Sequence, residues 1–282
     1  MKIEKATEMG FCFGVRRAIE LVEGAARERG PLQILGALVH NKQVMDSLAE
    51  RGIGVAASLD EIQSNIVAIA SHGAGPGVMA KIKAKGLEVI DATCPFVHRA
   101  QVIAQKLAKT GFSVLVFGDA THSEVEGVLA WAEGKASASL EVPQYLPRRL
   151  GILSQTTQSE TSFKRFLSEI VSLDLVKASE LRIFNTLCDA TRKHQIAALE
   201  LAGRVDLMVV IGGRHSANTR HLSEICVASG VDTRHIEIAA EMDSSWFQER
   251  HYVGITAGAS TPNEIIDEVM LRIEEIARGA KT

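Results

Sequence analysis

The chain has 282 residues, of which 46% are hydrophobic and 23% are charged, and its net charge is −3. This composition is typical of an ordinary globular protein and gives no broad basic surface that would favour nucleic acid. No apolar run approaches the roughly 18 residues of a membrane span, and the N-terminus lacks the apolar stretch of a signal peptide. We therefore expect a cytoplasmic protein that binds neither nucleic acid nor a membrane and whose cysteines stay reduced.

Short runs rich in Val and Ile alternate with amphipathic segments along the whole chain, which predicts βαβ units and parallel sheets. In the first third, strands are expected at 1–9, 32–41 and 66–76 and helices at 10–30, 42–52 and 77–86. The same order returns with strands at 87–94, 112–124 and 149–158 and helices at 95–111, 125–134 and 162–171. It returns again with strands at 181–188, 205–218 and 251–260 and helices at 189–204, 219–230 and 262–279.

This repeat predicts three α/β units, at 13–94, 95–188 and 189–282. The third unit ends in a helix with no strand after it, whereas the chain begins with a strand. The N-terminal segment 1–12 is therefore expected to complete the sheet of the third unit. The result would be a three-lobed α/β fold with a pseudo-threefold arrangement of parallel-sheet units.

Three of the four cysteines stand in the same register of this repeat. Cys12 is followed by His40, Cys94 by His122 and Cys188 by Ser216, 28 residues later in each case. Each cysteine follows a predicted strand and opens a predicted helix, where the helix dipole and the unbonded N–H groups stabilise a thiolate. A single cysteine is more often a small buried hydrophobe, but three in register favour ligation.

Thiolate ligands favour zinc or an iron–sulfur cluster over hard cations. No C-x-x-C pair is present, and three cysteines on a [4Fe–4S] cluster leave one iron without a protein ligand. Such an open position is what catalysis requires. Cys226 has no counterpart in the other two units and lies beside Leu222 and Ile225 on a predicted helix, so we interpret it as a core residue.

Polar candidates follow the predicted strands of all three units. Ligands bind beyond the carboxyl ends of the strands in open parallel sheets, and the candidates at these ends are His40, His72, His122, Glu124, Thr156, Ser216, Asn218 and Ser260. This set of donors with a single carboxylate suits a multiply charged anion such as a phosphate or diphosphate.

Glu124 follows His122 by two residues and is the natural proton donor, with its carboxyl group tuned by partial burial. A structural interpretation of the same segment is a helix start, with Ser123 as the N-cap and Glu126 in the capping-box position. Both interpretations can hold together. The six remaining histidines are expected on the surface or as hydrogen-bonded core residues: His98, His194, His215, His221, His235 and His251.

The motifs GFCFGVRRAI, VHN, SHG, DATCP, HSEVEG, SQTT, LCDAT, HSAN and TAGAS extend over nearly the whole chain. Together they resemble the 4-hydroxy-3-methylbut-2-enyl diphosphate reductases, the LytB/IspH family, which catalyse the last step of non-mevalonate isoprenoid biosynthesis. The resemblance implies a [4Fe–4S] cluster on Cys12, Cys94 and Cys188 at the centre of the three lobes. It also implies that the unique iron binds the allylic hydroxyl of the substrate. Two electrons and protons then remove this hydroxyl as water, giving isopentenyl and dimethylallyl diphosphates.

The resemblance implies roles for the polar candidates as well. His40, His72, Ser216, Asn218 and Ser260 would bind the diphosphate, and His122 would contact it or relay protons. Glu124 would supply the proton, and Thr156 would hold the hydroxyl or the departing water. An electron donor such as ferredoxin or flavodoxin is implied. One departure is Ala217, where the family commonly has a second serine.

Two alternatives remain open at this point. A three-cysteine iron–sulfur enzyme of the quinolinate synthase type would share the cluster but act on small carboxylic acids, and the HSEVEG and TAGAS segments argue against it. A non-catalytic metal or anion sensor would hold a structural zinc on the same three thiols.

Overall fold

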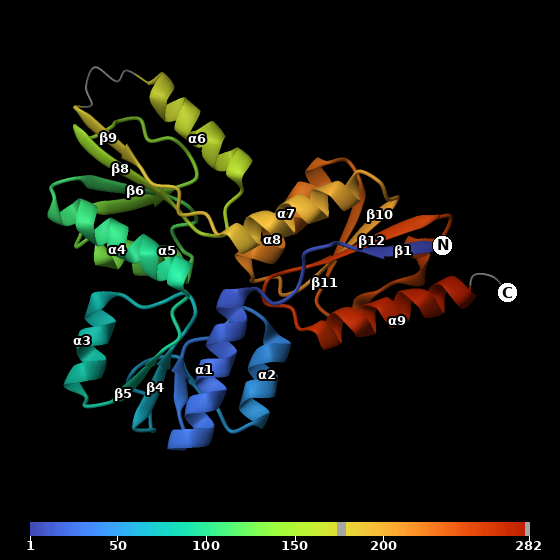
Figure 1. The fold of residues 1–282 in the computed structure, drawn as a ribbon, viewed down its shortest axis with the longest axis horizontal. Coiled ribbons are helices and arrows are strands. Elements are labelled where there is room, and N and C mark those ends of the chain that lie inside the picture. Colours follow the sequence, from blue (N-terminus) through green and yellow to red (C-terminus); the bar gives the residue numbers. More distant parts are fainter. Residues whose placement is uncertain (174–178, 280–282) are drawn as a thin grey trace. The chain divides into compact units, whose positions relative to one another are not determined.

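Three four-stranded sheets, all of them parallel, form the framework of the protein (Figure 1). The structure is a computed structural model that describes residues 1–173 and 179–279. Residues 174–178 and 280–282, which belong to the predicted second and third units, lie outside the described residues. The three parallel sheets confirm the predicted α/β fold class.

The chain divides into two compact units. Unit 1 comprises Met1–Val15, His40–Ser47 and Asp189–Thr282, and unit 2 comprises Arg16–Val39 and Leu48–Cys188. The boundaries predicted for three separate units stay a prediction.

Unit 2 contains two of the sheets. The first has the order β3-β2-β4-β5, formed by β2 (Gln33–Leu35), β3 (Gly54–Ala56), β4 (Ile66–Ile69) and β5 (Glu88–Asp91). The helices of this stretch of the chain are α1 (Phe13–Arg29), α2 (Lys42–Glu50) and α3 (Pro76–Ala84). Ile82 of α3 packs on Val67 and Ile69 of β4 in one apolar cluster, because a strand covered on both faces is apolar throughout.

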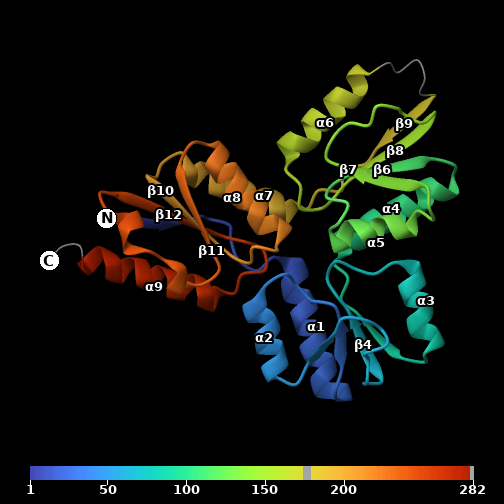
Figure 2. The ribbon, with the colours of Figure 1, turned by 180° about the vertical axis from the view of Figure 1, so that it is seen from behind.

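The second sheet of unit 2 has the order β7-β6-β8-β9, formed by β6 (Ser113–Phe117), β7 (Ala136–Ser139), β8 (Arg149–Ser154) and β9 (Glu180–Ile183). Helices α4 (Pro95–Lys109) and α5 (Ser123–Trp131) cover one face and α6 (Glu160–Ser172) covers the other, as Figures 1 and 2 show. Phe117 of β6 stacks on Phe163 of α6, with ring centroids 5.7 Å apart.

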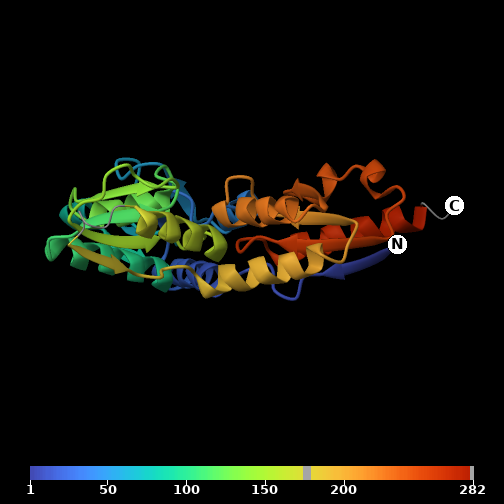
Figure 3. The ribbon, with the colours of Figure 1, turned by 90° about the horizontal axis from the view of Figure 1, so that it is seen from above.

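Unit 1 contains the third sheet, with the order β1-β12-β10-β11. It is formed by β1 (Lys2–Lys5), β10 (Leu207–Ile211), β11 (Asp232–Ile236) and β12 (Tyr252–Ala257). Helices α7 (Asp189–Ala202) and α8 (Ala217–Ala228) lie side by side over one face, and α9 (Asn263–Gly279) covers the other (Figures 1 and 3). The N-terminal strand pairs with β12 in parallel register, so the pairing expected from the missing last strand is confirmed.

One strand in each sheet was not predicted from the sequence, namely β3, β7 and β11. Each of these strands lies at the edge of its sheet, opposite the strand that leads toward a cysteine. An edge strand faces solvent on one side, so it needs no continuous apolar run. The sequences GVA, ASAS and DTRHI therefore gave no strand pattern.

Candidate functional site

The three cysteines of the 28-residue register occupy the same structural position. Each one directly precedes a helix, since α1 begins at Phe13, α4 at Pro95 and α7 at Asp189. Their backbone N–H groups donate to carbonyl oxygens that lie two residues beyond the ends of β12, β4 and β8: Cys12 to Ala259 at 3.0 Å, Cys94 to Ser71 at 2.9 Å, and Cys188 to Thr156 at 2.9 Å. The repeat seen in the sequence is therefore a repeat of backbone geometry at the carboxyl edge of each sheet.

The thiols of these three cysteines differ from that of Cys226 in their surroundings. Cys12, Cys94 and Cys188 are partly exposed, and none of the four cysteines forms a disulfide. Cys226 is fully buried in an apolar cluster with Leu222 and Met208, and burial raises the pKa of its thiol to about 12. A thiol with such a pKa stays protonated and does not serve as a ligand, so the prediction of a core role for Cys226 is confirmed.

The polar residues 28 positions after the cysteines also occupy equivalent structural positions. His40, His122 and Ser216 each lie five residues beyond the end of a strand, which is β2, β6 or β10, and close to the start of the next helix. At α5 the ring Nδ1 of His122 accepts a hydrogen bond from the Glu124 N–H at 3.1 Å, which makes His122 the N-cap. The prediction of Ser123 as N-cap was therefore wrong, because Ser123 is already the first helical residue and an imidazole nitrogen takes the capping role.

Glu124, Thr156 and Cys188 form a hydrogen-bonded chain inside unit 2. The Thr156 N–H lies 2.7 Å from Glu124 Oε1, and the Thr156 hydroxyl lies 2.8 Å from Glu124 Oε2. The Thr156 carbonyl oxygen in turn accepts the N–H of Cys188. Thr156 thus connects the predicted proton donor directly to the backbone of a predicted cluster ligand.

The pKa of the Glu124 carboxyl group is raised by its surroundings. Glu124 is only 3% exposed, so its burial is almost complete rather than partial as predicted. Burial raises the pKa of this carboxyl, and the two hydrogen bonds from Thr156 lower it by less. A buried carboxylic acid with a raised pKa is the form that general acid catalysis needs.

His72 lies on a loop between β4 and α3 and next to a pocket of about 430 Å³ in unit 2. Its Nδ1 donates to the carbonyl oxygen of Gly73 at 3.2 Å, because a carbonyl oxygen only accepts. Lys81 of α3 and Glu126 of α5 line the same pocket. His72 therefore lines, at the carboxyl edge of its sheet, a largely apolar pocket that carries a few polar side chains.

Ser216, Asn218 and Ser260 come together at the carboxyl edge of the sheet of unit 1. Their exposed fractions are 6%, 4% and 5%. Both side-chain atoms of Asn218, Oδ1 and Nδ2, and the hydroxyl of Ser260 have no hydrogen-bond partner among the described residues. Nearly all buried polar groups in proteins are hydrogen-bonded, so these atoms are suited to a ligand.

His40 belongs to unit 1, and the pKa of its ring is lowered. Burial is the main cause, and the nearby His215 and Arg220 lower the pKa further. His215 was predicted as a surface or core histidine, and Arg220 was not among the predicted site residues. The adjacency of His215 to Ser216, and the place of Arg220 in the first turn of the same helix, were the available signals.

His194 and two threonines also differ from expectation. His194 is 4% exposed, and its Nδ1 has no partner among the described residues, so it is a core histidine but not a fully hydrogen-bonded one. Thr219 and Thr256 are fully buried, and their hydroxyls likewise lack partners there. A single buried threonine gives no pattern in the sequence, so neither threonine was predicted.

The structure brings the predicted site residues together as two groups, one in each unit. Cys12, His40, Ser216, Asn218 and Ser260 belong to unit 1. Cys94, Cys188, His72, His122, Glu124 and Thr156 belong to unit 2. Within residues 1–173 and 179–279, no group of three His, Cys, Asp or Glu side chains is arranged to hold one metal ion. The convergence of the three thiols therefore stays a prediction.

The three parallel sheets, each with a cysteine placed at its carboxyl edge, define a class of α/β proteins built from a repeated sheet. Within this class, the chain belongs to the LytB protein family, which it matches over residues 3–274. A relative from Dehalococcoides mccartyi (strain CBDB1) is 49% identical over 99% of this chain and 100% of its own length. A relative from Geobacter sulfurreducens is 44% identical over the full length of both chains. Both relatives are named 4-hydroxy-3-methylbut-2-enyl diphosphate reductase.

Solved structures of reductases are also similar to this chain. A structure of (E)-4-hydroxy-3-methyl-but-2-enyl diphosphate reductase, described as the terminal enzyme of the non-mevalonate pathway, is 36% identical. It covers 98% of this chain and 100% of its own, with a TM-score of 0.69. A second structure, the E-1-hydroxy-2-methyl-but-2-enyl-4-diphosphate reductase from Plasmodium falciparum, has a TM-score of 0.89 at 24% identity and supports the fold. It covers 96% of this chain and 87% of its own.

These similarities confirm the family resemblance and do not favour the quinolinate synthase alternative. None of the helices in residues 1–173 and 179–279 combines the length and the apolar character that crossing a membrane requires.

Proposed function

We propose that this chain reduces 4-hydroxy-3-methylbut-2-enyl diphosphate to isopentenyl and dimethylallyl diphosphates. In this reaction the bond between the allylic carbon and its hydroxyl oxygen breaks. An external donor supplies the two electrons that this reduction requires. One proton converts the leaving hydroxyl into water and a second is added to the allylic carbon skeleton. The full-length similarity to reductases of this name carries the proposal.

The residues present suit a [4Fe–4S] cluster on Cys12, Cys94 and Cys188. The three thiols are partly exposed, and each lies at a helix N-terminus beyond a strand. Thiolates of one cluster bind different irons, so the thiols need not converge on a single ion. When bound, the cluster would supply electrons and an open iron for the substrate oxygen.

We assign the diphosphate to the buried polar groups of unit 1 together with the histidines of the carboxyl edges. Asn218 and Ser260 offer atoms without partners, and Ser216 lies at the N-terminus of α8, where N–H groups and the helix dipole favour an anion. His40 adds a hydrogen-bonding imidazole, and His72 and His122 are proposed as further diphosphate contacts. Ala217 removes one hydroxyl from this set and no ionisable group.

Glu124 is proposed as the proton donor. Its buried acid form lies within hydrogen-bonding distance of the Thr156 hydroxyl, so a proton can pass from Glu124 to a group held by Thr156. Because Nδ1 of His122 accepts the N–H of Glu124, its other ring nitrogen carries the proton. His122 is therefore oriented by the helix that it caps, and it would contact the diphosphate or relay protons.

The electrons are proposed to come from a small carrier protein such as ferredoxin or flavodoxin, in the cytoplasm. This part of the proposal rests on the reaction, which needs two electrons that no side chain of the chain supplies.

An anaerobic assay tests the function. Protein purified without oxygen is mixed with the allylic diphosphate and a chemical reductant, and product formation is followed together with iron and zinc content. We expect a brown, iron-containing protein that forms both products. A colourless protein with stoichiometric zinc and no turnover would instead support the metal sensor.

Asn218 provides a separate test of the diphosphate site. We expect Asn218→Ala to weaken binding of inorganic diphosphate by about tenfold or more, because hydrogen bonds to charged groups contribute about 1.5–3 kcal/mol. The variant should keep its melting temperature within a few degrees, since the side-chain amide of Asn218 has no hydrogen-bond partner to lose among residues 1–173 and 179–279. Calorimetric titration with diphosphate and a thermal melt measure the two effects. Unchanged affinity would remove Asn218 from the site.

A further inference from the structure

The turn that carries Ser216, residues 212–216 between β10 and α8, is held by side chains from the end of β11. His235 of β11 donates from Nε2 to the carbonyl oxygen of Gly212 at 2.8 Å. Glu237, just beyond β11, accepts the backbone N–H of Arg214 at Oε1, at 2.6 Å. The peptide groups on both sides of Gly213 are thus fixed by two neighbouring side chains that the proposed reaction does not use.

Gly213 lies against the backbone of His40. A Cβ atom at position 213 would come within 2.5 Å of the His40 carbonyl oxygen, so only glycine permits this approach. The place of the turn therefore sets the spacing between His40 and Ser216, two of the residues assigned to the diphosphate.

The same turn leads into the first turn of α8. The Ser216 N–H donates to the carbonyl oxygen of Gly213 at 3.0 Å, and the Ser216 hydroxyl accepts the N–H of Thr219 at 3.4 Å. Asn218 lies between these two residues in the helix. A displacement of the turn would therefore move Ser216 and Asn218 together.

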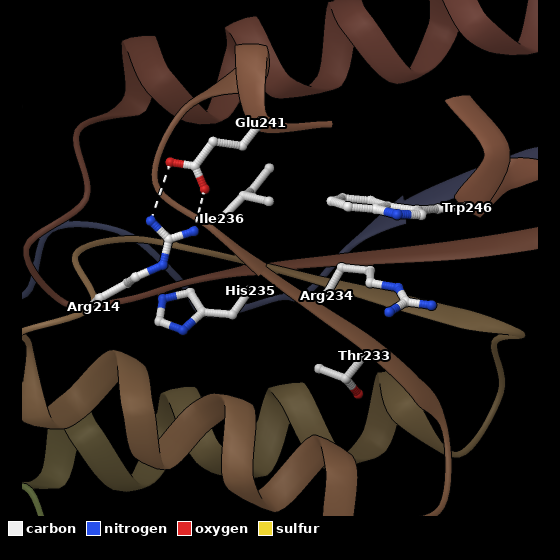
Figure 4. A pocket seen from close by; sticks show the side chains of 7 residues that line it. All are labelled: Arg214, Thr233, Arg234, His235, Ile236, Glu241 and Trp246. Atoms are coloured by element: carbon white, nitrogen blue, oxygen red, sulfur yellow. Dashed lines mark hydrogen bonds and ion pairs between the residues drawn. The ribbon is translucent and has the colours of Figure 1, made fainter. Parts of the chain in front are cut away.

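A pocket of about 520 Å³ opens behind the turn (Figure 4). His235, Arg214 and Glu241 line it, and Glu241 pairs with the guanidinium group of Arg214, with Oε2 2.5 Å from Nη2. Glu241 thus binds the side chain of Arg214, whereas Glu237 binds its backbone N–H and also lies within ion-pair distance of its side chain, with Oε2 3.9 Å from Nη1. The two carboxylates have nearly equal exposure, 26% and 25%, and form a matched pair.

We propose that His235 and Glu237 are positioning residues that hold the 212–216 turn so that His40, Ser216 and Asn218 meet one diphosphate. The assignment rests on the proposed function. It predicts that the backbone contact of Glu237 matters for the ligand and that the side-chain contact of Glu241 does not.

The test compares variants at these two positions in the anaerobically purified enzyme, with inorganic diphosphate as the calorimetric probe. Glu237→Ala should raise the dissociation constant of diphosphate about tenfold, as expected for a lost hydrogen bond to a charged acceptor. Glu237→Gln keeps an acceptor oxygen for the Arg214 N–H and should restore the affinity to within about threefold of the wild type. Glu241→Ala should bind diphosphate like the wild type.

His235 is tested in the same way. His235→Ala should weaken diphosphate binding, whereas His235→Gln, which retains a donor for the Gly212 carbonyl oxygen, should recover most of it. In steady-state assays Glu237→Ala should raise KM for the allylic diphosphate more than it lowers kcat, because it disturbs binding and leaves the proton donor in place.

Two results would overturn the assignment while leaving the proposed function intact. One is wild-type affinity in Glu237→Ala, and the other is an equal loss of affinity in Glu237→Ala and Glu241→Ala. If Glu237→Gln failed to recover binding although its melting temperature matched the wild type, the backbone contact would not be the cause. A wild-type enzyme that does not bind diphosphate would refute the ligand itself, and the positioning role with it.

Discussion

Glu124→Gln is expected to lower turnover by about 10²–10⁴-fold, the contribution typical of a positioned general acid. The substitution reproduces the shape and hydrogen bonding of the protonated acid. The amide oxygen can accept the Thr156 N–H, and the amide nitrogen can donate to the Thr156 hydroxyl. Only the transferable proton is lost. Diphosphate affinity and iron content should therefore stay at wild-type values.

The same variant has a predictable effect on stability. Burial raises the pKa of Glu124 in the folded state above its ordinary value of 4.5. A group of this kind stabilises the fold fully below the unfolded pKa, and the stabilisation is lost as the pH rises through the folded pKa. Glutamine does not ionise, so the melting temperature of Glu124→Gln should rise relative to that of the wild type as the pH increases above about 4.5.

Thermal melts across this pH range, combined with anaerobic turnover at one pH, separate the two effects. Thr156→Val tests one of the two contacts of Glu124 separately. It removes the Thr156 hydroxyl that contacts Oε2 but retains the Thr156 N–H that contacts Oε1. Normal turnover in Glu124→Gln would show that the proton comes from another group.

The central strands, and the place of each register cysteine at a helix start, were predictable from the sequence for a definite physical reason. The central strands, such as β10, are buried on both faces, so their apolar runs stand out. The edge strand β11 has no such run, and it was missed. Because β11 was not predicted, the proposed positioning role of His235 was not predicted either. That role depends on the contact between β11 and the 212–216 turn, which follows the neighbouring strand β10.

The 28-residue register marks only part of the proposed polar site. His122 and Ser216 were predicted because their spacing from a cysteine is shared, whereas residues such as Thr156 were predicted from their place after a strand. His215 and Glu237 stand outside the register, and contacts that depend on side-chain direction determine their roles. The N-cap of α5 was misassigned because serine is a usual capping residue and histidine is not among the preferred ones.

Single serine substitutions at Cys12, Cys94 and Cys188 are expected to remove the cluster from the protein, whereas Cys226→Ser should retain it. A serine hydroxyl is a harder and far less acidic ligand than a thiol, so it replaces a thiolate poorly on iron. Cys226 is the matched control, because burial holds its thiol in the protonated form, away from any ligand role. Iron and sulfide content and the visible absorption of the anaerobic protein measure the outcome.

Folding must be separated from cluster loss in this experiment. The three thiols are partly exposed, unlike that of Cys226, so their serine variants should keep the far-ultraviolet circular dichroism of the wild type. Cys226→Ser places a hydroxyl in an apolar cluster and should lower the stability by about 1–3 kcal/mol. Cys226→Ala avoids that hydroxyl and provides a second control.

The iron content of the variants at all four cysteine positions then shows which cysteines are cluster ligands. Loss of iron at the three register positions, but not at Cys226, is the result expected for one cluster shared by the three repeats. Full iron content in any one of the three serine variants would exclude that cysteine as a ligand. The three thiols occupy equivalent backbone positions, as one cluster with a similar ligand from each repeat would require. The residues 28 positions later, His40, His122 and Ser216, differ from one another, as expected if they serve a substrate with a diphosphate at one end and a hydroxyl at the other.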